Sequence, residues 1–447
     1  MKRHLSWSRR RSAAVAMVGA IAMVATACGS SGHKSTNGGG GGSTSTPGVT
    51  ATSITIGATV PLTGPAAPGY SEIAPAANAV FKWINAQGGV DGRKINYTYL
   101  DDQYNPSLTA QKVRQLVLQD NIFAEVGGLG TPTQSAVESF FNTEKVPQLF
   151  IESGCACWSD PKYPYSFGWM PNYIVEGKIL ATYIKSHFAG QKIGLLYQDD
   201  EFGEDNVKGV EQIIPASQVV SSQTYDVSTL SGPLSNQVAA LKAAGAQVVF
   251  LFTVPAATAL TLLPAAAIGY HPQWVISNVG DDPPTIAPLL SSFSKGAAGG
   301  ALLNGVISDA YIPPEAQTDN AWVQVTKKLL ADYDPGAPLD GNTEYGVALG
   351  YTFVQALQFA GKNLTRQSLL NALEKDGSKF VTPSFTPFAY STTDHYGMTG
   401  DEMVQITNGA TNQIKVLSPV YVSTNSGPVT VYHGKTLAPP ASLSSTA

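Results

Sequence analysis

Two of the three cysteines lie one residue apart, in the stretch LFIESGCACWSDP, and this spacing limits the chemistry open to them. A structural zinc site needs four ligands, and no histidine stands nearby in the sequence, so Cys155 and Cys157 alone do not predict a metal site. A disulfide between them requires a tight turn that brings the two α-carbons within about 7 Å. Such a bond closes a very small ring, so its entropic contribution to stability would be small.

The third cysteine, Cys28, follows a stretch typical of an export signal. Residues 1–27 hold five basic side chains and no acid, and their apolar run is too short for an ordinary membrane-spanning helix. Small residues stand directly before Cys28, so we predict that 1–27 is a signal peptide and that Cys28 carries the lipid of a lipoprotein. Residues 28–52, rich in Gly, Ser and Thr, predict a flexible tether.

This signal predicts a protein held by its lipid on the outer face of the cell membrane. We favour the general secretory route, although SRRRSA also resembles a twin-arginine signal. Because disulfides persist outside the cell, we expect Cys155 and Cys157 to form a local disulfide that shapes their loop rather than a catalytic thiol.

Composition narrows the class of protein further. Of the 447 residues, 43% are hydrophobic and 13% are charged, which is typical of a well-packed soluble protein with room for two domains. Without residues 1–27 the chain has 22 basic against 32 acidic side chains, a net charge of −10. A protein this acidic is not expected to bind nucleic acid, because phosphates would be repelled.

Short apolar runs alternate with helical patterns from Ile54 onward. ITIGATVPL and KINYTYLDD read as strands, with apolar residues at helical spacing between them. A second set of strands follows, in KIGLLYQDDEFG, SSQTYDV, QVVFLFT and PQWVISNV. This alternation predicts mainly parallel sheets covered by helices on both faces, and its repetition predicts two α/β lobes.

Ligands of open parallel sheets bind beyond the carboxyl ends of the strands, where loops lead into helix N-termini. The loops expected there contain GGLGTPTQS, IESGCACW, QDDEFGED, FTVPAA and SNVGDDPP. Hydroxyls of Thr131 and Thr133, with the amides of the helix that follows, suit a carboxylate; the alternative is a plain helix cap. The ring of Phe202 suits an apolar ligand, or else packs in the core.

Several of these segments together carry a family resemblance. ITIGATVPLTGPAAPGY, FKWINAQGGVDGRKINYTYLDDQYNP, VPQLFIESG and KIGLLYQDDEFGEDNVKGV resemble the leucine/isoleucine/valine-binding proteins, which are type I periplasmic binding proteins. The resemblance covers residues 53 to about 425. It implies two doubly wound parallel-sheet lobes joined by a three-strand hinge, with the ligand between them. The implied ranges are 53–170 plus 306–376 for lobe one, 171–305 plus 377–435 for lobe two, and 436–447 for a C-terminal tail.

The resemblance also implies a binding site. Thr131, Ser153 and Gly154 match the family's ligand contacts, and Phe202 stands where the family usually has Tyr. The full set of ligand-binding residues that we expect is Tyr70, Thr131, Thr133, Ser153, Gly154, Phe202, Thr253 and Asp281. Neither a catalytic residue nor a metal or other cofactor is expected.

One loop departs from the family pattern and leaves the ligand class open. The family holds the ammonium of an amino acid with a carboxylate in the loop that reads SNVGDDPP here. The matching position falls near Val279, and Asp281 and Asp282 follow two or three residues later. The ligand is therefore either a small amino acid of the branched-chain type or a related carboxylate without an ammonium group.

The resemblance implies a substrate-binding lipoprotein of an ABC importer. Its partners would be the small-molecule ligand, the permease and ATPase complex, and the membrane through the lipid anchor, and the protein would be a monomer. Two alternatives remain: a ligand-sensing subunit of a signalling receptor, or an exported hydrolase. The chain lacks the hydrolase motifs G-x-S-x-G and H-E-x-x-H, which disfavours the second.

Overall fold

The first set of apolar runs forms a parallel sheet of five strands. The computed structural model describes residues 46–440, so the predicted signal peptide, Cys28 and most of the tether lie outside the described residues. The sheet has the order β2 (Lys94–Asp101), β1 (Ser53–Val60), β3 (Glu125–Val126), β4 (Gln148–Ile151) and β5 (Ser166–Gly168). Its register pairs Ser53 with Lys94 and Val60 with Asp101.

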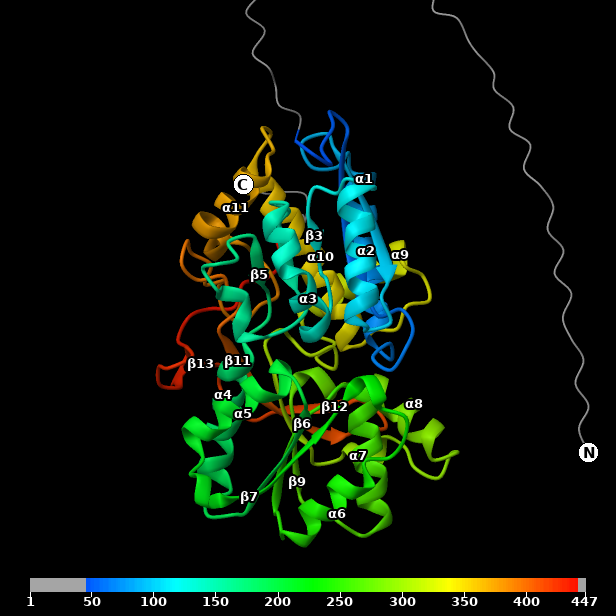
Figure 1. Cartoon of the computed structure of the whole chain (residues 1–447), viewed down its shortest axis with the longest axis vertical. Coiled ribbons are helices and arrows are strands. Elements are labelled where there is room, and N and C mark those ends of the chain that lie inside the picture. Colours follow the sequence, from blue (N-terminus) through cyan, green and yellow to red (C-terminus); the bar gives the residue numbers. More distant parts are fainter. Residues whose placement is uncertain (1–45, 441–447) are drawn as a thin grey trace, which may run out of the picture. The chain divides into compact units, whose positions relative to one another are not determined.

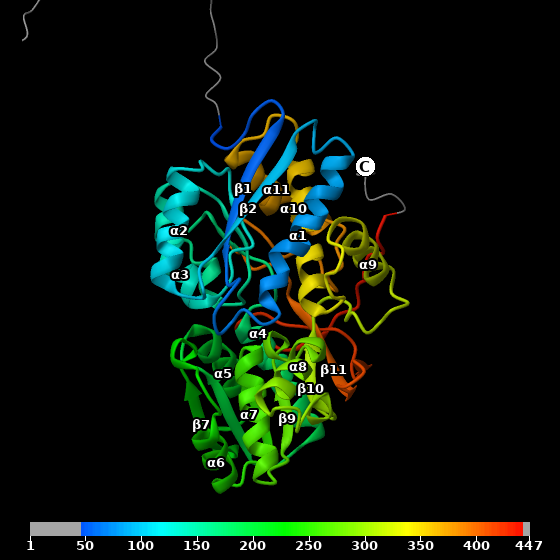
Figure 2. The same cartoon turned by 90° about the vertical axis from the view of Figure 1, so that its right-hand side faces the viewer.

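Helices from two separate parts of the chain cover this sheet. They are α1 (Ile73–Ala86), α2 (Pro106–Leu118), α3 (Thr131–Thr143), α9 (Ala321–Tyr333), α10 (Gly341–Ala360) and α11 (Arg366–Asp376). Asp340 caps α10 by accepting a hydrogen bond from the Thr343 amide. Gly346 lets α10 approach α1 closely, because a Cβ there would lie 2.3 Å from the Ile73 carbonyl oxygen. Figure 2 shows α1 in blue beside α10 in yellow.

The second set forms a larger sheet with parallel and antiparallel parts. Its parallel strands are β6 (Ile193–Gln198), β7 (Val219–Tyr225), β8 (Val248–Phe252), β9 (Gln273–Ile276) and β10 (Ile307–Ala310). Its antiparallel strands are β11 (Gly400–Asn408), β12 (Gln413–Val416), β13 (Tyr421–Val422) and β14 (Thr430–Val431). Every residue of β8 is buried, as expected for a strand covered on both faces.

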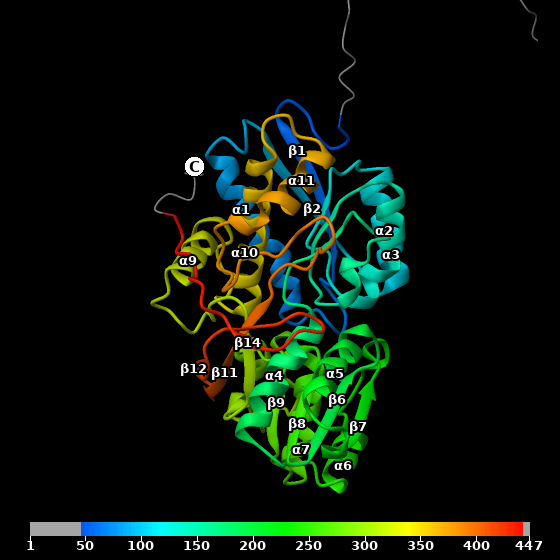
Figure 3. The same ribbon diagram turned by 90° about the vertical axis from the view of Figure 1, so that its left-hand side faces the viewer.

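Five helices cover the second sheet. They are α4 (Tyr173–His187), α5 (Glu201–Ile213), α6 (Ser235–Ala243), α7 (Pro255–Ala267) and α8 (Pro283–Phe293). Figure 3 shows α4 close to β11, and α4 also contacts β13, so the C-terminal strands complete a lobe that the middle of the chain begins.

The predicted α/β architecture with two parallel-sheet lobes is confirmed (Figure 1). The chain crosses between the lobes after β5, after β10 and before β11. Within residues 46–440, none of the helices combines the length and the apolar character needed to cross a membrane.

Two predicted lobe boundaries differ from the structure. The boundary at 305/306 comes too early, because Ile307 of β10 pairs with Val275 of β9 in the second sheet. The boundary at 376/377 also comes too early, because aromatic residues after it pack on lobe one: the rings of Tyr390 and Phe167 lie 5.6 Å apart. The chain enters the second sheet again only at β11.

Candidate ligand-binding site

Loops and helix starts of both lobes line a cavity of about 150 Å³. Lobe one contributes the loop between β3 and α3 and the first turn of α10. Lobe two contributes the start of α5 and the segments that follow β9 and β10. Apart from α10, which comes after α9, these segments follow the carboxyl ends of parallel strands, where ligands of such sheets bind.

Four of the predicted ligand-binding residues line this cavity: Tyr70, Thr131, Phe202 and Asp281. The Tyr70 hydroxyl donates a 2.6 Å hydrogen bond to the Val279 carbonyl oxygen and so joins the two lobes. The Phe202 ring lies 4.8 Å from the ring of Tyr173, a cavity residue at the start of α4. Aromatic side chains from both lobes thus meet at the cavity.

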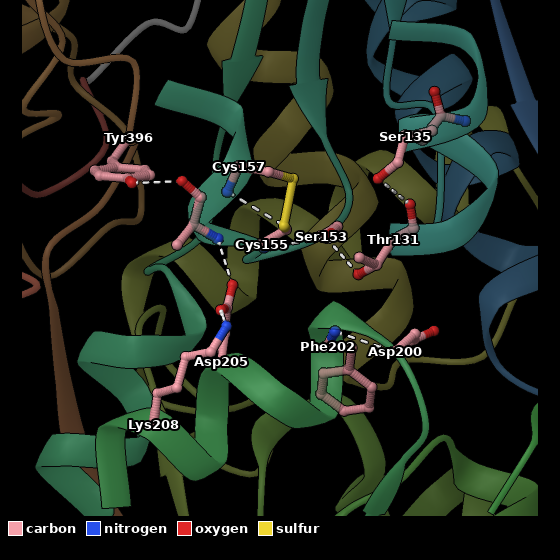
Figure 4. Close-up of a disulfide and its surroundings, with 12 residues drawn as sticks. Thr131, Ser135, Ser153, Cys155, Cys157, Asp200, Phe202, Asp205, Lys208 and Tyr396 are labelled. Carbon is pink, nitrogen blue, oxygen red and sulfur yellow. Dashed lines mark hydrogen bonds and ion pairs between the residues drawn. A yellow bond between two sulfur atoms is a disulfide. The ribbon is translucent and has the colours of Figure 1, made fainter. Parts of the chain in front are cut away.

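Two other predicted residues, Thr133 and Ser153, are buried but do not line the cavity. The Thr133 hydroxyl donates to the carbonyl oxygens of Leu129 and Gly130, as is common for a hydroxyl in the first turn of a helix. The hydroxyls of Ser153 and Thr131 share a 2.7 Å hydrogen bond (Figure 4). Each of the hydroxyls expected to hold a carboxylate therefore makes at least one hydrogen bond within the protein, and one hydroxyl of the Thr131–Ser153 pair keeps its proton for another acceptor.

Gly154 and Thr253 also lie away from the cavity lining. Gly154 serves packing, because a Cβ there would lie 2.6 Å from the Pro171 carbonyl oxygen and 2.8 Å from the Tyr173 ring. The Thr253 hydroxyl shares a 2.7 Å hydrogen bond with the Thr258 hydroxyl. Both positions support the loops that shape the site.

The cavity is strongly acidic. Six of its described lining residues carry carboxyl groups: Glu152, Asp281, Asp282, Asp309, Glu315 and Glu344. None of the described lining residues is Lys or Arg. The carboxyl groups come from both lobes and from the crossover after β10.

Asp282 ties the two lobes together at one end of the cavity. Its carboxylate caps α8 by accepting a 2.9 Å hydrogen bond from the Thr285 amide, and it accepts a 3.0 Å bond from the Gly341 amide at the start of α10. Burial, reinforced by the nearby Glu315 and Asp340, raises the pKa of Asp282 to about 8. The Glu315 carboxylate accepts a 2.5 Å hydrogen bond from the Asn412 side chain.

Glu344 has no such partner. Its side chain is almost fully buried, and neither carboxylate oxygen has a hydrogen-bond partner among residues 46–440. Burial, followed by repulsion from Glu315 and Asp340, raises the pKa of Glu344 well above its usual range. One oxygen of Glu152 and the hydroxyl of Tyr345 face the same cavity and likewise lack a partner within the described chain.

A second acidic group lies under the lobe-two side of the cavity. The Asn278 side-chain amide donates hydrogen bonds of 2.8 Å to Glu176 and 2.9 Å to Asp309. Burial raises the pKa of Asp309 to about 6, and burial together with repulsion from Asp309 and Asp401 raises the pKa of Glu176 well above its usual range. Asn278 thus holds two buried carboxyl groups in place beside the ligand space.

Sequence reasoning missed most of this acidic lining. Glu344 opens the long helix EYGVALGYTFVQALQFAG, where a single acid before an apolar run is a weak signal that could have been noticed. Glu315 follows two prolines in an irregular crossover, so no pattern marks it. Asp309 lies inside a strand that reads as ordinary sheet.

The cysteine loop lies beside the cavity. Cys155 and Cys157 form a disulfide with their α-carbons 5.1 Å apart. Figure 4 shows this disulfide between Asp205 and Tyr396, and the residue between the cysteines, Ala156, bonds to both. Its amide donates a 2.8 Å hydrogen bond to Asp205 of α5, and its carbonyl oxygen accepts a 2.6 Å bond from the Tyr396 hydroxyl. The loop therefore joins lobe one to lobe two and to the segment before β11.

Residues 46–440 contain no group of three or more His, Cys, Asp or Glu side chains arranged to hold a metal ion.

Comparison with known proteins places this fold and cavity in a family. The family model described as periplasmic binding protein matches residues 53–411. The Leu/Ile/Val-binding protein homolog 1 of Brucella suis is 24% identical over 335 residues, which cover 72% of this chain and 83% of that protein.

Solved structures share the fold at low identity. A fatty acid ABC transporter substrate-binding protein from Thermomonospora curvata has a TM-score of 0.73 and 21% identity, covering 85% of this chain and 95% of that one. A branched chain amino acid ABC transporter from Thermus thermophilus with bound valine has a TM-score of 0.70 and 19% identity, covering 83% and 97%. The predicted resemblance is confirmed, and the chain belongs to the periplasmic binding protein family, among relatives of the leucine/isoleucine/valine-binding type.

Proposed function

We propose that this protein is the substrate-binding component of an ABC importer and that it captures a small molecule bearing an amino group between its two lobes. The observation that carries the proposal is a cavity lined from both lobes by aromatic rings and carboxyl groups. Of the two ligand classes that the sequence leaves open, the amino-bearing one fits better, because its ammonium group would be attracted to the six carboxyl groups of the lining, whereas a carboxylate without an ammonium would only be repelled. A branched-chain amino acid is the first ligand to test, given the names of the relatives.

Capture would involve closure of the lobes. Contacts to the ligand come from both lobes, so the closed state gains all of them only when the ligand is bound. The segments after β5, after β10 and before β11 form the hinge. Small-angle scattering should then show a smaller radius of gyration when the ligand saturates the protein.

The lipid anchor completes the proposal. Cys28 would hold the protein at the membrane, and residues 28–52 would let it reach the permease. Replacing Cys28 by Ala should release the protein from the membrane fraction, whereas unchanged attachment would contradict the anchor.

Uptake tests the importer role directly. A thermal-shift screen of amino acids and amines identifies a ligand, because a molecule that binds only the folded state raises the melting temperature. Deleting the gene should then abolish uptake of that ligand, and restoring it should recover uptake. Tight binding with unchanged uptake in the deletion strain would indicate a sensor instead.

A further inference from the structure

We propose that the ligand carries a net positive charge and is an aliphatic amine or diamine rather than a zwitterionic amino acid. This inference rests on the function proposed above and specifies its substrate class. It follows from the charge, the unpartnered groups and the aromatic rings of the cavity.

The charge of the cavity lacks a counter-charge within the protein. Each of the six carboxyl groups is buried or partly buried, and no described Lys or Arg joins them in the lining. Around Glu344, Asp282 and Asp281, the neighbouring charges that shift the pKa are all acidic. A buried carboxyl group is normally paired when it is ionised and protonated when it is alone, so a cationic partner for these groups would have to come from the ligand.

Glu344 identifies where that partner would bind. Both of its carboxylate oxygens are buried without a hydrogen-bond partner among the described residues, and the side chain lines the cavity. The Tyr345 hydroxyl and one Glu152 oxygen are unpartnered in the same way. An ammonium group has three donors and no acceptor, so it satisfies carboxylates directly. Buried polar groups are rarely left unpaired, which is why these atoms point to a ligand donor.

Aromatic rings add a second preference for a cation. Tyr70, Tyr104, Tyr173, Phe202, Tyr311 and Tyr345 all line the cavity. The faces of such rings attract ammonium groups within about 6 Å of the ring centre. Apolar side chains such as Leu129, Met170 and Ile312 complete the wall and suit an aliphatic body between the charged groups.

In lobe one, the hydroxyls expected to hold a ligand carboxylate already bond within the protein, and only the amides at the start of α3 lack a side-chain cap. The hydroxyls of Thr131 and Ser153 bond each other, and the Thr133 hydroxyl bonds two backbone carbonyls. A zwitterion would therefore bring an anion into a cavity of carboxyl groups without a cationic side chain to receive it. A metal ion is a poorer occupant, since these carboxyl groups form no metal-binding cluster within residues 46–440.

A matched set of ligands tests the proposal by calorimetric titration. Leucine carries both charges, 3-methylbutylamine lacks the carboxylate, and 4-methyl-2-oxopentanoate lacks the ammonium. The diamine 1,5-diaminopentane carries two ammonium groups. We expect the monoamine or the diamine to bind at least about tenfold more tightly than leucine, and the keto acid not to bind.

Two outcomes overturn the inference. If leucine binds more tightly than both amines, the ligand is zwitterionic, while the proposed importer function still stands. If neither amine binds at millimolar concentration, the cation assignment fails, and uptake measurements alone then decide the importer role.

Two buried glutamates give a matched pair of variants. Glu344→Gln removes the charge at the cavity and should weaken amine binding about a hundredfold or more. Glu138→Gln is the control, because Glu138 is also buried with an unpartnered oxygen but lies in α3 outside the cavity lining. Equal affinity of the two variants would overturn the proposal. Glu315→Gln provides a second test at the cavity if the first variant does not fold.

Discussion

Two parts of lobe one treat their polar groups in opposite ways. At the strand ends, the hydroxyls of Thr131, Thr133 and Ser153 bond each other or the backbone. At the start of α10, Glu344 is buried with neither oxygen partnered among residues 46–440, and with the other five carboxyl groups of the cavity lining it forms what we call the acidic wall. Polar residue types near a strand end are therefore a poor guide to ligand contacts by themselves. What matters is whether their hydrogen-bonding capacity remains free once the chain has folded.

The difference has an energetic consequence. A hydroxyl pair that is satisfied internally costs the protein little, whereas a buried carboxylate without a partner is destabilised. Partial protonation of the carboxyl groups in the acidic wall lowers this cost of burial, as the raised pKa values of Asp282 and Asp309 indicate. Binding of a cation should then release protons and relieve the repulsion.

The largest effect is expected from neutralising the acidic wall. The double variant Glu315→Gln/Glu344→Gln should lose amine binding by more than about a thousandfold, since breaking a single buried charge pair costs about 3–5 kcal/mol. Titration calorimetry measures the loss, and circular dichroism checks the fold. Retention of wild-type affinity would show that this wall does not hold the ligand.

The ligand-free protein should lose stability as the pH rises from 5 to 8. Burial raises the pKa of Glu72 to about 7 and that of Asp282 to about 8. A carboxyl group whose pKa is raised by folding stabilises the protein fully below its unfolded-state pKa of about 4. This contribution is lost as the pH rises through the folded-state pKa.

We therefore expect the melting temperature to fall by about 5 °C across this range in differential scanning calorimetry. The Glu315→Gln/Glu344→Gln variant should show a smaller fall, because two of the acids are gone. A melting temperature that rises with pH in the wild type would contradict the protonated state of the wall.

Removing the disulfide should have a moderate effect on stability and little on binding. Cys155→Ser/Cys157→Ser opens a very small ring, so the free energy of unfolding should fall by about 1–2 kcal/mol in urea denaturation. Neither cysteine lines the cavity, and the bond from the Ala156 amide to Asp205 does not involve sulfur. A large loss of ligand affinity would mean that the loop positions cavity residues through the disulfide.

The smallest effect is expected on the hydroxyl side of the comparison. Thr131→Val/Ser153→Ala removes both members of one hydrogen bond, which is often nearly neutral, and it also removes the acceptor of a 3.2 Å hydrogen bond from the Cys155 amide, which should lower stability rather than affinity. Ligand affinity should change by less than about threefold. A hundredfold loss would indicate that these hydroxyls turn toward the ligand on binding, and the contrast between them and the acidic wall would disappear.

Sequence patterns predicted the fold better than the site. Apolar runs such as VVFLF and the helical spacing between strands involve residues that are close in the sequence, so the sequence alone is enough to predict these strands and helices. The loops around Thr131, Phe202 and Asp281 also fell at the right edge of the sheets. That the hydroxyls bond each other, and that Glu344 of α10 reaches the same cavity as Asp282, depends on packing between distant segments. Local sequence patterns do not predict contacts of that kind.

A crystal structure of the complex with 1,5-diaminopentane tests the central claim most directly. The acidic wall predicts a ligand nitrogen within about 3 Å of a Glu344 oxygen and the aliphatic body among the tyrosine rings. Density at the start of α3, with Glu344 still unpartnered, would contradict the account.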